Sequence, residues 1–315
     1  LIIRDDPHAV GEYIGNCIYT DRALMSFIAD RIVDFKPMGS SPIPTYNTSS
    51  AREGWQPVTS VSSQVCICVT CLDVYATRRR FEDAVTFNVD EYAGLPRDHS
   101  ESYHTFMLRE FFSYIDIPAA NVNILDEKDD DLIGECKAEI KVRGGIELFL
   151  GGTGEDGYIA FNELNSAPDR VMLCRTGSLL VSRTRIKTLA YDTILANARF
   201  FGDDVSAVPR MALTVGVGTV LDSWEVVVVV TGQRKSLGIS KAIEDSVNHP
   251  WTLSVLQIHP WALIIVNEDA IAELHIKTAK YFKSVERVQE EVEEAHAKSP
   301  AQGPEEGDGP LGGME

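Results

Sequence analysis

The feature that most constrains the fold is an unbroken run of five valines at residues 226–230. A strand with one face in water alternates apolar and polar side chains, because successive side chains point to opposite faces. A run that is apolar at every position is typical of a strand covered on both faces, and such strands belong mostly to parallel sheets. The run therefore predicts an α/β fold, Rossmann-like, with a mainly parallel sheet and helices on both faces.

Strand and helix patterns alternate along the rest of the chain. Apolar runs predict the strands, and apolar side chains at helical spacing predict the helices between them. In sheets of this kind ligands bind at the carboxyl ends of the strands, so the informative residues should directly follow each strand. The expected strands are 1–4, 65–72, 84–89, 146–151, 211–217, 225–231 and 262–266, and the expected helices are 7–35, 100–113, 190–201 and 234–246.

The charge balance excludes some classes of partner. The 315 residues carry 29 basic and 47 acidic side chains, a net charge of −18. Nucleic acids and anionic lipids attract clustered Lys and Arg, so we expect neither nucleic acid nor a membrane as a partner. No stretch reaches the roughly 18 consecutive apolar residues that a membrane span needs. Six cysteines are few for this length, which favours a reducing, cytoplasmic setting.

Two adjacent carboxylates, Asp90 and Glu91, directly follow the strand expected at 84–89. A carboxylate there can act as a general base if partial burial raises its pKa toward neutrality. The alternative is a solvated turn that caps the next helix. The pattern alone leaves both interpretations open.

A glycine-rich loop at 151–158 follows the strand expected at 146–151. It matches G-x-G-x-x-G, which can cradle a dinucleotide pyrophosphate at the start of a helix. Glu155 and Asp156 lie inside the loop, and their charges would repel a pyrophosphate. The loop better suits a neutral or proton-donating ligand group near Asp156 and Glu163, or it is a tight structural turn.

Three cations, Arg183, Arg185 and Lys187, alternate within six residues of an acidic chain. Such a local contrast is what a phosphate or carboxylate site requires, and the alternation fits a strand that exposes the three on one face. An ordinary solvated strand edge is the alternative. Arg199 and Lys235 are further candidate phosphate ligands.

The cysteines at positions 66, 68 and 71 raise the question of a metal site. Tetrahedral zinc takes four protein ligands in a structural site. Strand alternation would divide these three thiols over two faces, so we expect buried strand thiols and no metal.

Taken together, these segments resemble the glucosamine-6-phosphate deaminases. Several long motifs occur in the family's order, and the opening IIRDD is also similar to the family. The resemblance implies a Rossmann-like α/β fold. The matching segments are TFNVDEYAGLPRDHSESYHTFM (86–107), LFLGGTGEDGYIAFNE (148–163), SLLVSRTRIKTL (178–189), ALTVGVGTVLD (212–222) and VNHPWT (247–252).

The resemblance also implies an activity. The family converts glucosamine 6-phosphate to fructose 6-phosphate and ammonia in N-acetylglucosamine catabolism, and it uses no cofactor. By resemblance, Asp156, Tyr158 and Glu163 open the sugar ring, and Asp90 moves the C2 proton to C1. A lactonase of the pentose phosphate pathway on the same fold is an alternative, but NVDEY and SRTRIKTL favour the deaminase.

Binding sites follow from the same resemblance. The substrate phosphate is expected at Gly39, Ser40, Ser41, Arg199 and Lys235. Some members carry an allosteric site for N-acetylglucosamine 6-phosphate at a subunit interface, which implies a homo-oligomer, commonly a hexamer. The matching allosteric positions are Ser178, Arg185, Lys187 and Tyr281.

The chain departs from the family at its ring-opening residue. Tyr158 stands where the family has histidine. An imidazole titrates at about 6.5 and a phenol at about 10, so the phenol is the poorer base at pH 7. This departure keeps open a second function, that of a non-catalytic relative that binds sugar phosphates.

The phosphate loop also departs from the family. Met38 replaces a threonine, and no apolar run precedes the loop at 39–42, which removes a strand from the expected sheet. A missing strand would expose the neighbouring ladders, and the strand at 65–72 is a candidate for the vacant place. We expect one sugar-phosphate isomerase/deaminase domain at 1–285, with atypical segments at 47–80 and 164–176, followed by an acidic helix and disordered tail at 286–315.

Overall fold

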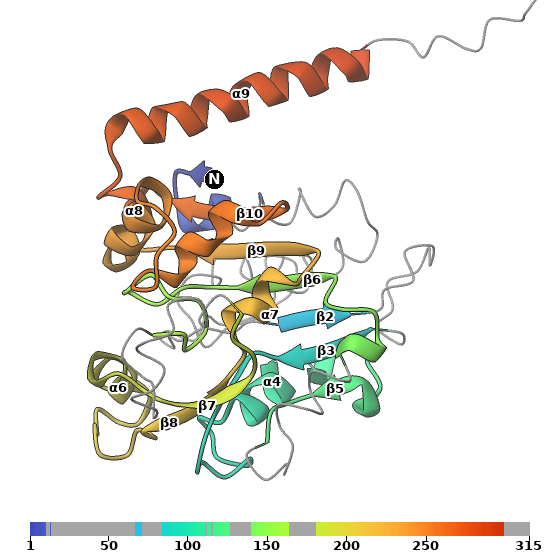
Figure 1. The fold of residues 1–315 in the computed structure, drawn as a ribbon, viewed down its shortest axis with the longest axis vertical. Coiled ribbons are helices and arrows are strands. Elements are labelled where there is room, and N and C mark those ends of the chain that lie inside the picture. Colours follow the sequence, from blue (N-terminus) through green and yellow to red (C-terminus); the bar gives the residue numbers. More distant parts are fainter. Residues whose placement is uncertain are drawn as a thin grey trace, which may run out of the picture.

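A seven-stranded sheet dominates the computed structural model of this chain (Figure 1). The structure describes residues 1–10, 13, 67–70, 84–110, 112–114, 116–126, 140–163 and 181–298. The strands of the sheet are β1 (Ile2–Arg4), β10 (Ala262–Asn267), β9 (Glu225–Val230), β6 (Leu148–Gly151), β2 (Ile67–Thr70), β3 (Val85–Asn88) and β5 (Val122–Asn123), in that order. Neighbours from β1 to β6 are parallel, as are β3 and β5, which confirms the predicted mainly parallel sheet.

The valine run occupies β9, between β10 and β6. Val226, Val228 and Val230 pack into the apolar core on one face of the sheet, and Val227 and Val229 pack into the core on the other. None of the five is more than 7% exposed. The predicted burial of this strand on both faces is confirmed.

Strand β2 fills the middle of the sheet and runs antiparallel to both of its neighbours, β6 and β3. The strand expected at 65–72 is thus present as β2, and its ladder covers polar groups that β6 and β3 would otherwise expose. That it replaces the missing family strand stays a prediction. Because β3 and β6 are each antiparallel to β2, they run in the same direction. Their carboxyl ends, and that of β9, lie at one edge of the sheet.

The strand expected at 211–217 is not in the parallel sheet. It forms β8 (Met211–Thr214), which pairs antiparallel with β4 (Asp90–Tyr92) and β7 (Arg185–Thr188) in a second sheet. Only Val89 separates β3 from β4, so the chain passes from one sheet to the other just before Asp90, the first residue of β4. The predicted strand is right, and its predicted place is wrong because β8 pairs with this extension instead of with a strand of the parallel sheet.

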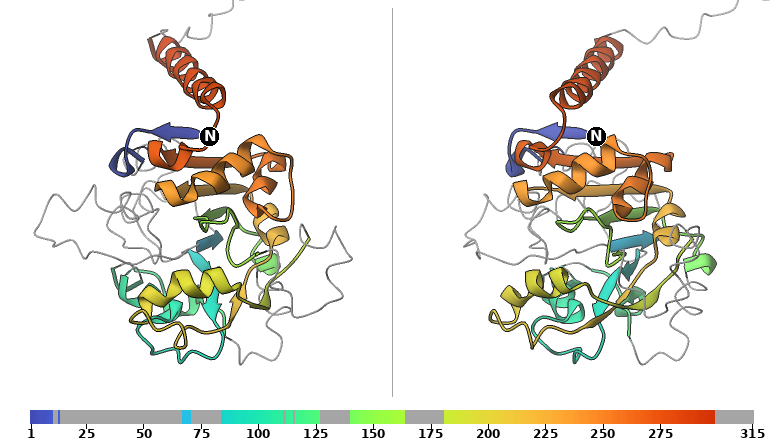
Figure 2. Two further views of the ribbon diagram at one scale, coloured as in Figure 1. Left: turned by 90° about the vertical axis from the view of Figure 1, so that its left-hand side faces the viewer. Right: turned by 60° about the vertical axis from the view of Figure 1, so that its left-hand side comes forward.

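Helices cover both faces of the main sheet (Figures 1 and 2). Helices α4 and α6 contribute to the core around Val227, and α7 and α8 contribute to the core around Val228. The α-helices are α4 (Tyr103–Glu110), α6 (Tyr191–Asn197), α7 (Val217–Leu221), α8 (Ser236–Glu244) and α9 (Ile276–Lys298). The 3-10 helices are η2 (Phe112–Tyr114), η3 (Ala119–Asn121), η5 (Ala198–Phe200), η6 (Gln233–Lys235), η7 (Thr252–Ile258) and η8 (Glu268–Ile271).

Most expected helices are present but shorter than predicted. The expected helix at 100–113 is α4, that at 190–201 is α6 followed by η5, and that at 234–246 is α8. The helix expected at 7–35 begins as predicted at Pro7, and the Asp6 carboxylate accepts the Ala9 N–H at 2.8 Å, as a helix cap does. Most of its length lies outside the described residues.

The C-terminal helix α9 extends away from the sheet (Figure 2). It includes the acidic stretch predicted to be helical, starts ten residues before position 286 at Ile276, and runs without a break past it. Arg4 of β1 pairs with Glu286 of this helix. The domain division at 285 remains a prediction, and 299–315 lie outside the described residues. None of the described helices combines the length and the apolar character that crossing a membrane requires.

The pairing of β2 makes a testable prediction. Replacing Cys68 by proline removes a ladder N–H in the middle of a sheet and leaves the carbonyl that it bonded without a partner, which should lower the free energy of unfolding by about 1 to 3 kcal/mol. The matched control Cys68→Val keeps the N–H and should change stability much less. Urea denaturation of both variants checks this, and equal stabilities would contradict the central place of β2.

Candidate active site

The residues singled out from the sequence gather at the edge where β3, β6 and β9 end. Asp90 follows β3, the loop with Asp156 and Tyr158 follows β6, and Lys235 follows β9. The parallel direction of these strands brings the three segments together, as expected for this class of sheet.

Asp90 is a buried carboxyl group with an unusual pKa. It is 2% exposed, and neither of its oxygens makes a hydrogen bond within the described ranges. Burial raises its pKa to about 8, and the Thr214 hydroxyl and Phe161 N–H partly oppose the shift, while Glu91 and Glu163 add to it. A carboxylate with a pKa near neutrality suits a general base.

The neighbouring Glu91 has a structural role. Its carboxylate accepts the N–H groups of Tyr92, Tyr103 and His104 at 2.9 to 3.0 Å, which caps the start of α4. Burial raises the pKa of Glu91, and these three hydrogen bonds oppose the shift. Of the two predicted roles, the helix cap thus belongs to Glu91, and that of a general base is left to Asp90. The segment is a buried strand, and not the solvated turn that the second interpretation assumed.

The glycine-rich loop is a closed turn. Thr153 and Ile159 form an isolated antiparallel bridge across it, and no helix follows among residues 152–163. The dinucleotide interpretation fails because that fingerprint needs a helix directly after the glycines. Gly154 leaves room for the Tyr158 ring, since a Cβ at position 154 would lie 2.6 Å from its Cζ atom.

Behind this loop, a hydroxyl joins Tyr158 to Glu163. Tyr158 Oη lies 2.8 Å from Thr193 Oγ1, and Thr193 donates a short hydrogen bond to Glu163 Oε1. The other carboxylate oxygen accepts the Ala190 N–H at 2.7 Å. All three side chains are at most 8% exposed. Burial raises the pKa of Glu163, although its hydrogen bonds oppose this, and burial also raises the pKa of Tyr158 above the ordinary phenol value.

Asp156, on the same loop, is exposed. Burial of part of its carboxyl, together with the charges of Asp192 and Glu155, raises its pKa. It is therefore the member of the predicted ring-opening set that faces water, while Tyr158 and Glu163 are held behind it.

Two cations of the basic segment face inward. Arg185 Nη2 donates to Asn162 Oδ1 at 2.7 Å, and Lys187 Nζ donates to the Glu163 backbone oxygen at 2.8 Å. Burial lowers the pKa of Arg185 to about 10 and that of Lys187 to about 8. The predicted exposure of this strand face is wrong for Lys187, which is 4% exposed, because its ammonium group is bound beside Glu163.

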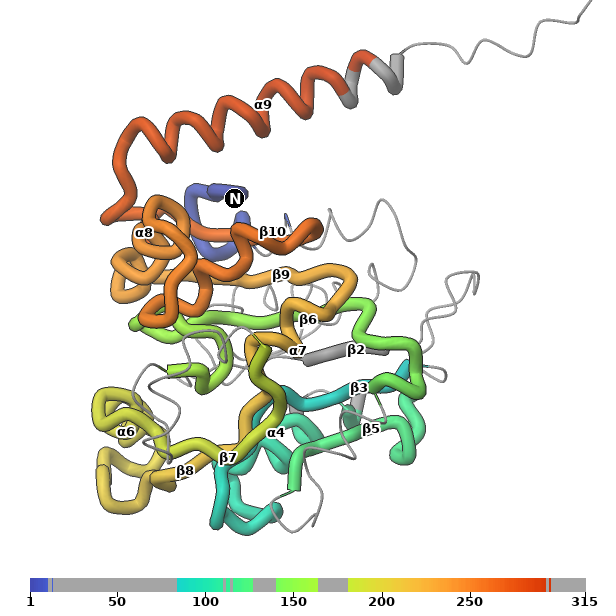
Figure 3. The backbone as a smooth tube through the Cα atoms, in the orientation of Figure 1, coloured from blue at the N-terminus to red at the C-terminus, as the bar shows by residue number. Residues whose placement is uncertain are grey.

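Of the other predicted allosteric residues, Tyr281 is not brought to this pair within one chain. Tyr281 is 62% exposed on α9, which lies at the opposite end of the molecule from β7 (Figures 1 and 3). Ser178 lies outside the described residues.

A group of basic side chains lies beside the glycine-rich loop. Burial lowers the pKa of Arg199 and that of Lys235, the latter to about 8, and the charge of Arg199 adds to the lowering for Lys235. Arg234 pairs with Glu155 at 3.7 Å. The two predicted phosphate ligands are thus within electrostatic reach of one another. Their predicted partners Gly39, Ser40 and Ser41 lie outside the described residues.

Comparison with curated proteins decides the family. The chain is 54% identical over 304 residues to the glucosamine-6-phosphate deaminase of Aedes aegypti, which covers 91% of this chain and 93% of that protein. The chain belongs to the glucosamine-6-phosphate deaminase family. It is also 56% identical over 208 residues to glucosamine-6-phosphate deaminase 1 of Bos taurus, covering 65% and 68% of the two chains. No protein-family model matches the chain.

Solved structures of this family and its neighbours share the fold. A monomeric glucosamine-6-phosphate deaminase superposes with a TM-score of 0.61 at 23% identity, covering 87% of this chain and 100% of that one. A 6-phosphogluconolactonase from Thermotoga maritima superposes with a TM-score of 0.51 at 15% identity, covering 84% and 98%. These likenesses support the Rossmann-like fold class.

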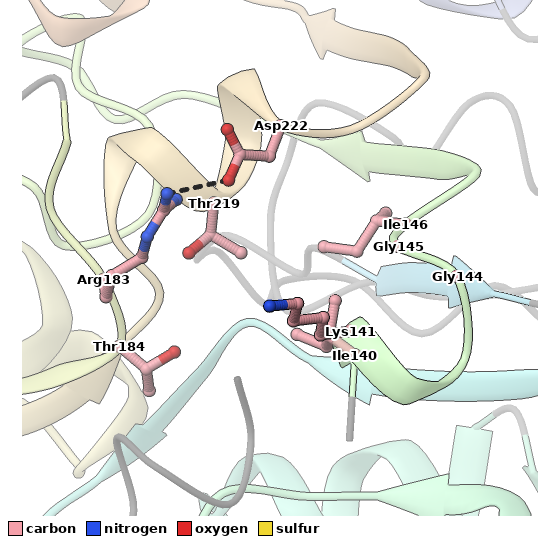
Figure 4. Close-up of a pocket in the computed structure, with 9 residues that line it drawn as sticks. All are labelled: Ile140, Lys141, Gly144, Gly145, Ile146, Arg183, Thr184, Thr219 and Asp222. Atoms are coloured by element: carbon pink, nitrogen blue, oxygen red, sulfur yellow. Dashed lines mark ion pairs between the residues drawn. The ribbon is translucent and has the colours of Figure 1, made fainter. Parts of the chain in front are cut away.

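Two further observations concern metal binding and a second cavity. The described residues hold no group of three or more side chains arranged to bind a metal ion. A cavity of about 280 Å³ opens between Ile146, Thr219 and the ion pair of Arg183 with Asp222 (Figure 4). Its lining residues Ile146 and Asp222 come shortly before β6 and β9 in the chain, whereas the candidate active site follows these strands. None of the predicted catalytic residues lines the cavity, so it is separate from the candidate active site.

Sequence reasoning missed Thr193, which no motif singled out. Thr193 and Asn197 are polar, lie four residues apart on α6 and are buried. Asn197 donates to the Tyr92 hydroxyl at 3.0 Å, and Thr193 contacts Tyr158 and Glu163. Two polar side chains on the buried face of a short helix were the signal that could have found them, because buried polar groups require partners.

The pKa of Asp90 predicts a stability that depends on pH. Between its unfolded value of about 3.9 and its folded value of about 8, the folded chain keeps a proton that the unfolded chain releases. The free energy of unfolding should therefore fall with rising pH by about 1.4 kcal/mol per unit from this residue. Asp90→Asn cannot ionise, so it should gain stability over the parent from pH 5 to 8 and level off above.

Urea denaturation at each pH measures this difference. The matched control Asp98→Asn, at an exposed position, should show a constant difference from the parent. A constant difference for Asp90→Asn would contradict the raised pKa.

Proposed function

We propose that this protein converts glucosamine 6-phosphate to fructose 6-phosphate and ammonia, in the catabolism of N-acetylglucosamine. Membership of the deaminase family supports the general reaction. The observation that carries the proposal for this chain is Asp90, a buried carboxyl with a pKa near neutrality at the strand edge where the Tyr158 and Glu163 side chains also lie.

The reaction needs three steps from these groups. Tyr158, Glu163 and Asp156 move the anomeric proton to the ring oxygen, which opens the sugar to an aldehyde. Asp90 then takes the C2 proton while the aldehyde oxygen takes one from the ammonium group of the substrate, which gives an enol-amine, and Asp90 returns its proton to C1, which gives the protonated ketimine with a C1 hydroxyl. Water adds to the ketimine carbon and ammonia leaves, so no cofactor is needed and Asp90 ends as a carboxylate.

Arg199 and Lys235, with Gly39, Ser40 and Ser41, bind the phosphate of the substrate in this proposal. The charge of Arg199 helps to lower the pKa of Lys235, which supports a shared anion, because a dianionic phosphate would relieve this repulsion. Glu155 pairs with Arg234, and its charge also opposes the lowering of the pKa of Arg199 and of Lys235, so a bound phosphate would lie beside this carboxylate.

The same proposal includes regulation by N-acetylglucosamine 6-phosphate at Ser178, Arg185, Lys187 and Tyr281. Arg185 and Lys187 bond Asn162 and the Glu163 backbone, so an anion that draws these cations away would act directly on the chain that holds Glu163. Tyr281 lies far from them in one chain, which supports a site completed by a second copy in a homo-oligomer such as a hexamer. The catalytic domain is 1–285, the tail is 286–315, and the low cysteine count supports a cytoplasmic setting.

Ammonia release from glucosamine 6-phosphate by the purified full chain tests the proposal. We expect turnover, and kcat/KM should rise with pH and level off above about pH 8, as Asp90 loses its proton. Asp90→Asn should lower kcat by about 10²- to 10⁴-fold, the usual contribution of a general base. The exposed control Asp98→Asn should retain the parent rate.

A folded chain that binds glucosamine 6-phosphate, measured by calorimetry, and releases no ammonia would contradict the proposal. That result would identify the protein as the non-catalytic relative that the Tyr158 replacement left open.

A further inference from the structure

Thr193 lies between two residues of the proposed ring-opening set and touches both. Its hydroxyl has a single proton, and that proton is donated to Glu163 Oε1. A hydroxyl that has given its proton to one partner can only accept from another. Tyr158 is therefore the donor in its 2.8 Å contact with Thr193.

The direction of these bonds defines a path for a proton. It runs from Tyr158 through Thr193 to Glu163, whose second carboxylate oxygen accepts the Ala190 N–H, as an ionised carboxylate does. All three side chains are at least nine-tenths buried, so the path is shielded from exchange with water.

The path answers the chemical difficulty that Tyr158 raises. Burial, followed by the charge of Glu163, holds the pKa of Tyr158 above the ordinary phenol value, so a free phenolate is not accessible near pH 7. A phenol can still accept a proton if it loses its own in the same step. Glu163, whose pKa is raised by burial, is the acceptor at the other end.

We propose that Thr193 is a positioning residue that relays the proton of Tyr158 to Glu163 during ring opening. This inference rests on the proposed function. The anomeric O–H bond breaks as its proton moves to Tyr158 Oη, the Tyr158 proton moves to Thr193 Oγ1, and the Thr193 proton moves to Glu163 Oε1. The bond between C1 and the ring oxygen breaks, leaving the C1 aldehyde and an alkoxide at the ring oxygen.

The same proton then returns along the path in reverse to the ring oxygen. Both oxygens are bonded to C1 in the closed sugar, so one phenol can reach each in turn. Glu163 ends as a carboxylate and no net proton is consumed. The relay thus lets a tyrosine serve where the family has an imidazole.

Two substitutions separate this role from a purely structural one. Thr193→Val keeps the shape and removes the hydroxyl, and we expect it to lower kcat by at least about 10-fold with little change in KM. Thr193→Ser restores the hydroxyl and should recover most of the rate. A solvent deuterium isotope effect on the parent kcat should shrink in Thr193→Val if ring opening then proceeds without the relay. The matched control Thr219→Val, a buried threonine on α7, should keep the parent rate.

A second readout does not need activity. The free energies of unfolding of Tyr158→Phe, Thr193→Val and the double variant form a double-mutant cycle. The double variant should lose less than the sum of the single losses, while Tyr158→Phe combined with Thr219→Val should be additive.

The two readouts distinguish failure of the relay from failure of the proposed function. A parent chain that releases ammonia, with Thr193→Val at the parent rate, overturns the relay and leaves the deaminase standing. An inactive parent with clear coupling between Tyr158 and Thr193 overturns the deaminase and leaves the hydrogen-bonded path. An inactive parent with additive losses overturns both.

Discussion

The parallel ladder of β10, β9 and β6 determines where the site can form. Its central strand is buried on both faces, so no ligand can approach it from above or below, and only the carboxyl edge is left for chemistry. Strand β2 connects this ladder to β3. Because β2 is antiparallel to both β6 and β3, strand β3 runs in the same direction as β6. As a result Asp90, the glycine-rich loop and Lys235, which are far apart in sequence, end at one edge.

Burial at this edge sets the acid–base character of each group. Asp90 is removed from water by burial, and the Thr214 hydroxyl and the Phe161 N–H oppose this only in part, so its pKa rises to about 8. Glu91, one residue on, is buried too but receives three backbone N–H groups and serves α4. Adjacent carboxylates on one strand point to opposite faces, which is why one is available for proton transfer and the other is not.

Much of this could be predicted from local pattern. The valine run identified the sheet class, and the position of Asp90 after an apolar strand identified a candidate base. The cap on α4 was the other open interpretation, and the structure assigns it to Glu91. Lys235 follows β9 at the carboxyl edge, as its position after the valine run indicated.

The features that the sequence could not predict depend on contacts between residues that are far apart in the chain. Thr193 carries no motif, and only the fold places it against Tyr158, 35 residues away. Lys187 was expected in solvent because alternation says which side chains share a face but not what covers that face. The antiparallel sense of β2 and the removal of β8 to a second sheet depend on pairing partners, which periodicity does not specify.

The central claim, that Asp90 is a shielded base which carries the C2 proton to C1, is tested most directly by isotope transfer. Glucosamine 6-phosphate labelled with deuterium at C2 is converted in ordinary water, and the fructose 6-phosphate is examined by NMR for deuterium at C1. A buried base exchanges its proton slowly, so a measurable fraction of the label should appear at C1, and Asp90→Asn should form no product on the same timescale. Product from Asp90→Asn at the parent rate, with the same label content, would contradict the account.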